Sequence, residues 1–375
     1  MILIISICIV LIYLILIGWF VFGFDKVKNF EFKNSIPKTE FSVIIPFRNE
    51  AQNLPSLLQS ISELKYPRNL YEIILVDDES DDNSVDLIMR FLANVQNDIY
   101  VIKNERKTNS PKKDAITKAI SIAKYEWILT TDADCLLPEN WLLSFDAFIQ
   151  KTNAKFIVAP VTYVIKNSLL HTFQLMNVLS LQGATIGSFG IGKPFLCNGA
   201  NLAYKKDLFH ELNGFSGNTN IASGDDIFLL EKAIKTYKKD TRYLKCEHAI
   251  ITTIPESSWS GLISQNIRWA SKSSAYSNLF GKLTGLVVLL MNSLLITILL
   301  LTILQLFSFK SFVYILFIKF CVDLLLVYKT AIFFNQKSYL KSYYICYIIY
   351  PFFSVYIAII SFFGDYKWKG RTHKK

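Results

Sequence analysis

Two aspartates, Asp132 and Asp134, stand two residues apart directly after the apolar run 127–129. Carboxylate oxygens are ligands that Mg²⁺ and Mn²⁺ accept, and both ions bridge readily to phosphate groups. The spacing therefore suggests one divalent ion that is held by few protein ligands and completed by a diphosphate. An Asp-x-Asp pair alone is a weak signal, so its meaning depends on the residues that the fold gathers beside it.

The elements that would position this pair alternate between strand and helix. Apolar segments typical of strands are followed each time by a segment typical of a helix. The expected strands are 41–46, 71–78, 98–104 and 126–134, and the expected helices are 53–64, one from about residue 83, 111–123 and one after Pro138. This alternation predicts a mostly parallel sheet with helices on both faces.

Polar residues gather where the expected strands end. They are Arg48, Asn49 and Glu50 after the first strand, Asp77 and Asp78 after the second, and Asp132 and Asp134 after the fourth. Ligands of such sheets bind outside the carboxyl ends of the strands. Several acids at one edge repel each other unless positive charge lies among them, which predicts a bound cation or a ligand rich in hydrogen-bond donors.

A glycine-rich phosphate loop is missing from the sequence, which has neither G-x-G-x-x-G nor G-x-x-x-x-G-K-[ST]. The charge of a bound diphosphate would have to be met by a metal on the acidic pair and by lysines such as Lys112 and Lys113.

Apolar segments at both ends of the chain predict a membrane protein. Residues 1–24 carry no charge and are long enough to cross a bilayer, and we interpret them as an anchor that is not cleaved. Further spans are expected at 283–309, at 311–333, where Lys319 and Asp323 could pair inside a helix bundle, and at 342–364, which Pro351 interrupts and which could be re-entrant instead. The remaining segments are a soluble domain at 38–257, an amphipathic interfacial helix at 258–280 and a basic tail at 365–375.

Charge and cysteine content narrow the class further. Lys26, Lys28, Lys33 and Lys38 follow the first span, which predicts a cytoplasmic soluble domain of an inner or cell membrane protein. The net charge of +10 suits anionic lipid headgroups, so no nucleic-acid partner is expected. The six cysteines form no C-x-x-C pair, which favours reduced thiols.

Several motifs between Phe41 and Trp269 resemble, in order, those of the family 2 glycosyltransferases of the GT-A fold. The matching stretches are VIIPFRNE (43–50), VDDESDD (76–82), PKKDAITKAI (111–120), DAD (132–134), SGDDIFLL (223–230) and QNIRW (265–269). The resemblance implies an α/β, Rossmann-like domain that binds a nucleotide-diphospho-sugar, flanked here by N-terminal and C-terminal transmembrane helices. It also implies a membrane-associated, inverting, metal-dependent hexosyltransferase.

The resemblance assigns roles residue by residue. Asp226 is the expected catalytic base, and Asp134 with Asp132 is expected to hold Mg²⁺ or Mn²⁺. The expected contacts of the nucleotide sugar are Pro46, Arg48, Glu50, Asp78, Lys112, Asp132 and Asp134. The expected contacts of the acceptor or the diphosphate are Asn198, Gly199, Asn201, Asp225, Gln265, Arg268 and Trp269. Two motifs depart from the family pattern, with Pro111 in place of a glycine and Asp225 in place of a glutamate.

The resulting reaction is the attack of an acceptor hydroxyl on the anomeric carbon of a nucleotide sugar, with a UDP-sugar as the expected donor. Because the membrane portion is small, a lipid-linked or membrane-associated acceptor is favoured over a processive polysaccharide synthase with a channel. A scaffold that keeps the fold without catalysis is the alternative outside this class. Plainer structural roles also exist, since Asp225 and Asp226 could simply begin a helix and Lys112 and Lys113 could form a solvated face.

Overall fold

The structure is a computed structural model and describes residues 2–31, 36–93, 98–221, 223–363, 366–368 and 371–373. The chain forms two compact units. The sheet unit comprises residues 28–164 and 197–254, and the helical unit comprises residues 1–27, 165–196 and 255–375. Lys33 and parts of the expected basic tail lie outside the described residues.

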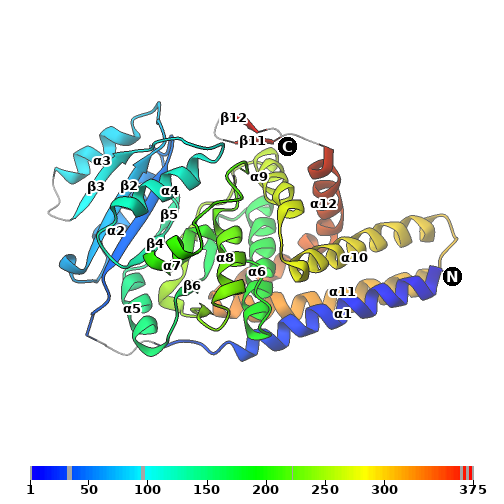
Figure 1. The fold of residues 1–375 in the computed structure, drawn as a ribbon. Coiled ribbons are helices and arrows are strands. Elements are labelled where there is room, and N and C mark those ends of the chain that lie inside the picture. Colours follow the sequence, from blue (N-terminus) through cyan, green and yellow to red (C-terminus); the bar gives the residue numbers. More distant parts are fainter. Residues whose placement is uncertain are drawn as a thin grey trace. The chain divides into compact units, whose positions relative to one another are not determined.

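A seven-stranded mixed sheet organises the sheet unit (Figure 1). Its strands, in spatial order, are β3 (Ile99–Lys103), β2 (Tyr71–Asp77), β1 (Phe41–Phe47), β4 (Trp127–Thr130), β8 (Leu202–Lys205), β6 (Phe156–Val158) and β9 (Thr241–Tyr243). The four strands that come first in the chain pair in parallel, in agreement with the strand–helix alternation of the sequence. β8 runs antiparallel to both β4 and β6, while β6 and β9 at the far edge pair in parallel, so the sheet is mixed.

Helices cover both faces of this sheet, because its strands are apolar on both sides. α2 (Leu54–Ser62), α3 (Ser84–Leu92) and α5 (Trp141–Lys151) share one buried core with β1 and β2. α4 (Pro111–Ile122) packs against the same two strands, and its Ala115, Ile116 and Ala119 are buried there. Since the helices follow the parallel strands, the carboxyl ends of β1, β2 and β4 lie at one edge, which is where the polar loops begin.

Short elements complete the sheet unit. A second sheet of three strands contains β5 (Cys135–Leu136), β10 (Ile251–Thr253) and β7 (Val161–Tyr163), and it starts directly after Asp134. The other elements are η1 (Arg68–Leu70), η2 (Gly199–Asn201), α7 (Lys206–Glu211), α8 (Asp225–Thr236) and η3 (Glu247–Ala249).

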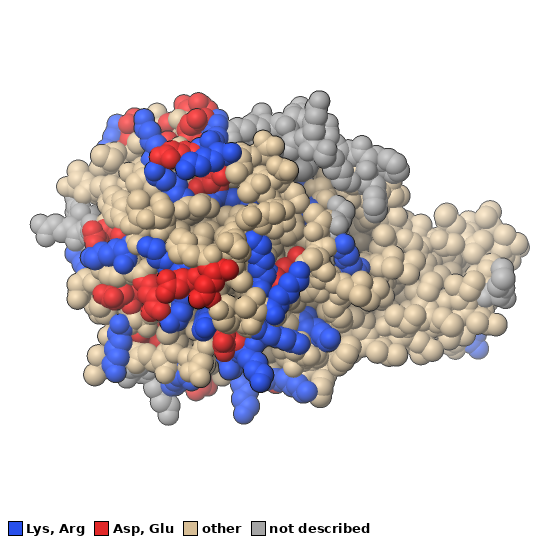
Figure 2. Space-filling view, in the orientation of Figure 1, with Lys and Arg blue, Asp and Glu red and all other residues tan. Residues whose placement is uncertain are grey.

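The helical unit is built from long helices. They are α1 (Ile2–Lys26), α6 (Leu169–Gly190), α9 (Trp259–Ser271), α10 (Leu279–Ile303), α11 (Phe309–Phe333) and α12 (Tyr343–Phe363), with short 3-10 turns η4 (Lys272–Ala275) and η5 (Lys337–Ser342) and a hairpin of β11 (Tyr366–Trp368) and β12 (Arg371–His373). Four segments within the described residues, Ile2–Lys26, Leu279–Ile303, Phe309–Phe333 and Lys337–Ser361, are long and apolar enough to cross a membrane. The ends of α1 and α10 that lie at the right of Figure 1 show almost no charge in the same view in Figure 2.

Two boundaries differ clearly from the sequence expectation. The strand expected at 126–134 ends as β4 at Thr130, so Asp132 and Asp134 lie in the loop after it. The span expected at 283–309 appears as a helix that starts at Leu279 and ends at Ile303. Gln305 has φ +59°, in the left-handed region that ends a helix, and the Ser308 hydroxyl accepts a hydrogen bond from the Ser311 amide at 3.4 Å to cap α11. A turn therefore separates the two helices before residue 309.

Close packing and one buried ion pair join the helices of this unit. A Cβ added at Gly190 of α6 would lie 1.8 Å from the Gly23 carbonyl oxygen of α1, so the backbones touch where only glycine fits. In α11, Lys319 Nζ lies 2.6 Å from Asp323 Oδ2, and the Tyr13 hydroxyl of α1 donates to Asp323 Oδ1 at 2.7 Å. The expected Lys319–Asp323 pair thus forms and ties α11 to α1.

Candidate active site

A lysine joins two acids at the carboxyl edge of the sheet. Lys112, the second residue of α4, places Nζ 2.6 Å from Asp132 Oδ1 in the loop after β4. The same Nζ lies 3.3 Å from Asp225 Oδ2 at the start of α8. Side chains that lie far apart along the chain therefore meet at one point.

The turn at residues 198–201 brings α8 to this point. Gly199 N donates to Asp226 Oδ2 at 3.2 Å, and Thr130 Oγ1 at the end of β4 donates to the Gly199 carbonyl at 2.9 Å. A Cβ at residue 199 would lie 2.9 Å from Asp225 Oδ2 and 3.4 Å from Lys112 Nζ. Glycine is needed there because a side chain would push the two acids away from the lysine.

Helix geometry explains why two adjacent acids are tolerated at 225–226. Gly224 has φ +85° and precedes α8, so Asp225 and Asp226 form its first turn. Unpaired backbone amides and the helix dipole make this end of a helix favourable for negative charge. Asp225 and Asp226 therefore stabilise the start of α8. They also make the contacts to Lys112 and Gly199.

The electrostatics of Lys112 favour a charged ammonium. Burial alone would lower the pKa of Lys112, but the negative charges of Asp132, Asp225 and Asp226 outweigh it and raise the pKa above the usual range for lysine. The ammonium therefore carries its charge at any physiological pH. Its side chain is 21% exposed, so a ligand can still reach it.

Asp134 directly precedes β5 of the second sheet. Its Oδ1 lies 3.7 Å from Cys135 Sγ, and burial together with Asp134 and Asp132 raises the pKa of that thiol well above its usual value. Cys135 is thus a neutral, buried thiol, which excludes it as a nucleophile.

Carboxylate oxygens are the donors that this edge of the sheet offers to a hard divalent cation. Asp132 and Asp225 lie on the Lys112 ammonium, Asp226 accepts from Gly199 N, and Asp134 follows Asp132 by two residues. No group of three or more His, Cys, Asp or Glu side chains with metal-ligand geometry occurs among the described residues. Asp132 and Asp134 could therefore hold an ion only with ligands from another molecule, such as a diphosphate.

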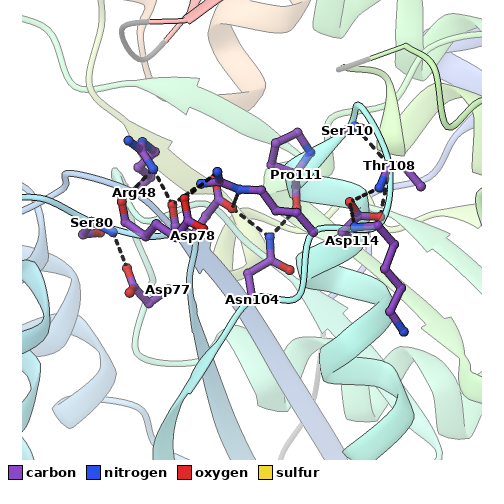
Figure 3. A network of polar contacts seen from close by, with 12 residues as sticks. Arg48, Asp77, Asp78, Ser80, Asn104, Thr108, Ser110, Pro111 and Asp114 are labelled. Atoms are coloured by element: carbon purple, nitrogen blue, oxygen red, sulfur yellow. Dashed lines mark hydrogen bonds and ion pairs between the residues drawn. The ribbon is translucent and has the colours of Figure 1, made fainter.

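A second polar network surrounds Asp78 at the end of β2 (Figure 3). Arg106 Nε donates to Asp78 Oδ1 at 2.7 Å, and Asn104 Nδ2 donates to the same oxygen at 2.8 Å. Arg48 Nη1 donates to the Asp78 carbonyl at 2.7 Å, and Arg106 Nη2 donates to it at 2.9 Å. The carboxylate that the motif assigned to the nucleotide base is therefore fixed in place by two side chains from the segment after β3.

Arg106 and Asn104 were missing from the sequence expectation, although a signal for them existed. Both directly follow β3, as the other polar residues follow β1, β2 and β4. The rule that polar residues at strand ends line the site would have included them.

Hydrogen bonds join the loop after β1 to the loop after β2. Asn49 has φ +52°, and its Oδ1 accepts from Asp81 N at 2.8 Å. Glu50 N donates to Ser84 Oγ at 2.9 Å, and Glu50 Oε2 accepts from Asn53 Nδ2 at 2.6 Å. Glu50 is buried, and its carboxylate stabilises the loop at the start of α2.

Pro46 and Arg48 lie at the carboxyl end of β1, Pro46 inside the strand and Arg48 in the loop after it. Pro46 lies within β1, opposite Val76 of β2, and is half-buried. Arg48 spans from the loop after β1 to the loop after β2, with Nη2 3.0 Å from Asp81 Oδ2.

Three further residues have structural partners. Lys113 is 1% exposed and donates to the carbonyls of Asn218 and Ile221 at 2.7 and 2.9 Å, so it shapes the loop before α8 and does not form a solvated face. Asn201 is fully buried, and its amide bonds Trp141 Nε1 and the carbonyls of Pro160 and Ala249. Asn198 Oδ1 accepts from Ala200 N at 3.0 Å, which closes the 198–201 turn.

The segment Gln265, Arg268 and Trp269 belongs to α9 of the helical unit. Gln265 Nε2 donates to Glu256 Oε1 at 3.3 Å, and Gln174 of α6 clamps the Glu256 backbone through bonds of 2.8 and 2.9 Å. Trp259 at the start of α9 packs on Phe173 with ring centroids 5.4 Å apart. These contacts tie α9 to α6.

Comparison with known proteins agrees with this architecture. Residues 42–212 match the glycosyl transferase family 2 model. The chain is 23% identical over 192 residues to the glycosyltransferase AglE of Haloferax volcanii, covering 51% of this chain and 60% of that protein. It is 38% identical over 148 residues to the undecaprenyl-phosphate 4-deoxy-4-formamido-L-arabinose transferase of Proteus mirabilis, covering 34% and 45%.

One solved structure shows the same fold. It is the mannosyltransferase PcManGT from Pyrobaculum calidifontis in complex with GDP-Man and Mn²⁺, with a TM-score of 0.56, 16% identity and coverage of 97% of this chain and 99% of that one. Residues 42–212 therefore resemble a family 2 glycosyltransferase domain, and the chain shares the fold of that mannosyltransferase structure. It spans less than two thirds of the length of the curated relatives described above.

Proposed function

We propose that this protein is an inverting glycosyltransferase that moves a sugar from a nucleotide-diphospho-sugar to a lipid-linked or membrane-associated acceptor. The observation that carries the proposal is the convergence of Asp132, Asp225 and Asp226 around Lys112 and Gly199 at the carboxyl edge of the sheet. The glycosyltransferase relatives support a transfer reaction as its chemistry.

Asp226 acts as the general base in this proposal. It removes the proton of the acceptor hydroxyl while that oxygen attacks the anomeric carbon and the bond to the diphosphate oxygen breaks. The hydrogen bonds from Gly199 N and Ile227 N hold both carboxylate oxygens in place, at 3.2 and 2.7 Å. A single displacement on the face opposite the leaving group inverts the anomeric centre.

Positive charge stabilises the leaving nucleoside diphosphate. Lys112 offers its ammonium to the diphosphate, and Mg²⁺ or Mn²⁺ held by Asp132 and Asp134 would neutralise the developing charge. The Mn²⁺ in the similar mannosyltransferase structure supports a divalent requirement, and which ion serves this protein is left to the metal series described below.

Base recognition falls to Asp78, whose position Arg106 and Asn104 fix. A carboxylate accepts the ring N–H of uracil, and a UDP-sugar is the donor that we propose. Guanine also presents a ring N–H, and the similar mannosyltransferase structure contains GDP-Man. Both nucleotides therefore belong in the donor test.

The helical unit indicates which class of acceptor the protein uses. Its four long apolar segments suit a membrane protein, and the relative from Proteus mirabilis is named for an undecaprenyl-phosphate acceptor. We assign Gln265, Arg268 and Trp269 of α9 to the acceptor or the diphosphate. Because Lys26 ends α1 and Lys28 and Lys38 follow it, we place the sheet unit on the cytoplasmic side, where activated sugars are made.

The test is a donor panel on the purified full-length protein in detergent, with polyprenyl phosphate and membrane lipid extract as acceptors. UDP- and GDP-sugars are compared with Mn²⁺, with Mg²⁺ and with EDTA, and both diphosphate release and labelled lipid are measured. We expect one donor class to give labelled lipid only with a divalent ion. No transfer from any nucleotide sugar would contradict the proposal and favour a scaffold.

Product length separates this function from processive synthesis. A single-addition enzyme gives one product band of acceptor plus one sugar. A ladder of long chains would instead identify a polysaccharide synthase with the same site.

A further inference from the structure

A buried glutamine of α6 holds the residue that lies just before α9. Gln174 is 1% exposed, and both ends of its amide bond the backbone of Glu256. Gln174 Oε1 accepts from Glu256 N at 2.8 Å, and Gln174 Nε2 donates to the Glu256 carbonyl at 2.9 Å. These two bonds fix the backbone of Glu256 within the helical unit, so its side chain starts from a defined position.

The Glu256 carboxylate lies beside the first turn of α9. A Cβ added at Gly261 would lie 2.7 Å from Glu256 Oε2 and 3.2 Å from Ser258 Oγ, and Ser258 is the N-cap that accepts from Gly261 N. Negative charge is favourable at this end of a helix. Glycine at residue 261 therefore leaves the space that the carboxylate occupies.

The other oxygen of this carboxylate determines how the Gln265 amide is oriented. Gln265 Nε2 donates to Glu256 Oε1 at 3.3 Å. Because a carboxylate only accepts hydrogen bonds, the amide must turn its NH₂ group toward Glu256, which leaves its oxygen for a different donor. Gln265 Oε1 is buried and has no hydrogen-bond partner in the part of the chain that the structure describes. A buried acceptor without a donor is costly, so this oxygen indicates a site whose donor comes from another molecule.

The polarity of this site distinguishes between the ligands that could occupy it. The oxygens of a diphosphate accept hydrogen bonds, as the Gln265 oxygen does, so the two would repel each other. A hydroxyl can donate, and it is therefore the complementary group.

We propose that Glu256 is a positioning residue, which orients the Gln265 amide so that its oxygen accepts a hydrogen bond from a hydroxyl of the acceptor. This inference rests on the proposed function and narrows it. Gln265 serves the acceptor and not the diphosphate. The acceptor is a lipid whose headgroup carries a hydroxyl, as a glycolipid does, and not a bare lipid phosphate.

Two probes with the same alkyl chain test the headgroup. Octyl β-glucoside presents hydroxyls, whereas octyl phosphate presents only a phosphate. Calorimetry measures the affinity of each probe, below its micellar concentration, for the full-length protein in phosphatidylcholine nanodiscs, with empty nanodiscs as the reference. The affinity for inorganic pyrophosphate is measured on the same samples. We expect the wild type to bind octyl β-glucoside more tightly than octyl phosphate, and the reverse order would overturn the hydroxyl assignment.

Two variants disturb the orientation without changing Gln265. Glu256→Gln lets the Gln265 amide turn either way, and Gly261→Ala displaces the Glu256 carboxylate. Each should weaken octyl β-glucoside by roughly three- to tenfold, which is the loss of one hydrogen bond, and leave pyrophosphate affinity unchanged. The controls are Ser264→Ala, at an exposed position of α9, and Gly285→Ala, where nothing lies within 4 Å of a Cβ.

The variants also supply the results that would contradict the proposal. Octyl β-glucoside affinities equal to that of the wild type in both variants would overturn the positioning role. Gln265→Leu should weaken octyl β-glucoside alone, and weaker pyrophosphate binding would show that Gln265 serves the diphosphate. Thermal unfolding checks the fold of each variant, and Glu256→Gln decides if Gly261→Ala does not fold, because it keeps the size of the side chain. None of these readouts needs sugar transfer, so a failed donor panel and a failed positioning test are separate results.

Discussion

At the scale of single residues, the account gives Asp226 the chemical step. Asp226→Asn keeps an oxygen that can accept from Gly199 N but removes the basic carboxylate. Loss of a general base lowers kcat by roughly 10²–10⁴-fold, and we expect a loss in that range with an unchanged Tm. Steady-state transfer assays measure it, with Asp207→Asn, an exposed acid at the start of α7, as the control.

Gly199 makes a second prediction at this scale. Gly199→Ala places a Cβ 2.9 Å from Asp225 Oδ2, so the Asp225 carboxylate must shift and its contact with Lys112 is disturbed. Overpacking of this kind costs about 1–3 kcal/mol, and we expect a lower Tm together with a reduced kcat. Gly285→Ala is the control, because nothing lies within 4 Å of a Cβ there. An alanine variant with wild-type kcat would show that the Asp225–Lys112 geometry is not needed for catalysis.

The individual residues of the site were only partly predictable from sequence. Asp132, Asp225 and Lys112 belong to recognisable motifs, and the structure brings these three together. The buried roles of Lys113 and Asn201 were not predictable, because their partners are backbone carbonyls whose positions depend on the tertiary fold. Motif spacing identifies a residue type at a position but does not say which way its side chain points.

At the scale of elements, the buried pair in α11 links three helices. Lys319 is 1% exposed and pairs with Asp323, which also accepts from Tyr13 of α1, and its ammonium lies 4.9 Å from the Tyr347 ring of α12. Removing one partner of a buried ion pair is more harmful than removing both, because a lone buried charge is left behind.

A double-mutant cycle tests this link. We expect Asp323→Ala to destabilise the detergent-solubilised protein by about 3 kcal/mol or more, and Lys319→Met in addition to recover most of that loss. Thermal unfolding of wild type, both single variants and the double variant gives the coupling. Additive losses would mean that the pair does not interact in the folded protein.

The elements themselves divide into those that the sequence predicts and those that it does not. Strands such as β1 and β2 have seven residues each and a continuous apolar pattern, so their position and parallel pairing follow from the strand–helix alternation. β5 has two residues and β10 has three, which is too short for any periodicity. The antiparallel insertion of β8 depends on long-range pairing that local propensity does not encode.

At the scale of the whole molecule, the account predicts a topology. If the sheet unit is cytoplasmic and α10 and α11 both cross, the turn at residues 304–308 faces the outside. Leu306 is 69% exposed in the structure, and Leu306→Cys should react with a membrane-impermeant maleimide in intact cells. A cysteine placed at exposed Asp207 of the sheet unit should react only after the membrane is opened, with the wild type giving the background of native thiols. The reverse pattern would place the sheet unit on the wrong side for activated sugars.

The most direct test of the central claim is a structure of the full-length protein with Mn²⁺ and a non-transferable analogue of the donor that the panel identifies. We expect the metal on Asp132 and Asp134, the diphosphate in contact with Lys112, the base at Asp78 and the anomeric carbon open to Asp226. Density for the nucleotide at any place other than this carboxyl edge, or an anomeric carbon beyond the reach of an acceptor oxygen bound at Asp226, would contradict it.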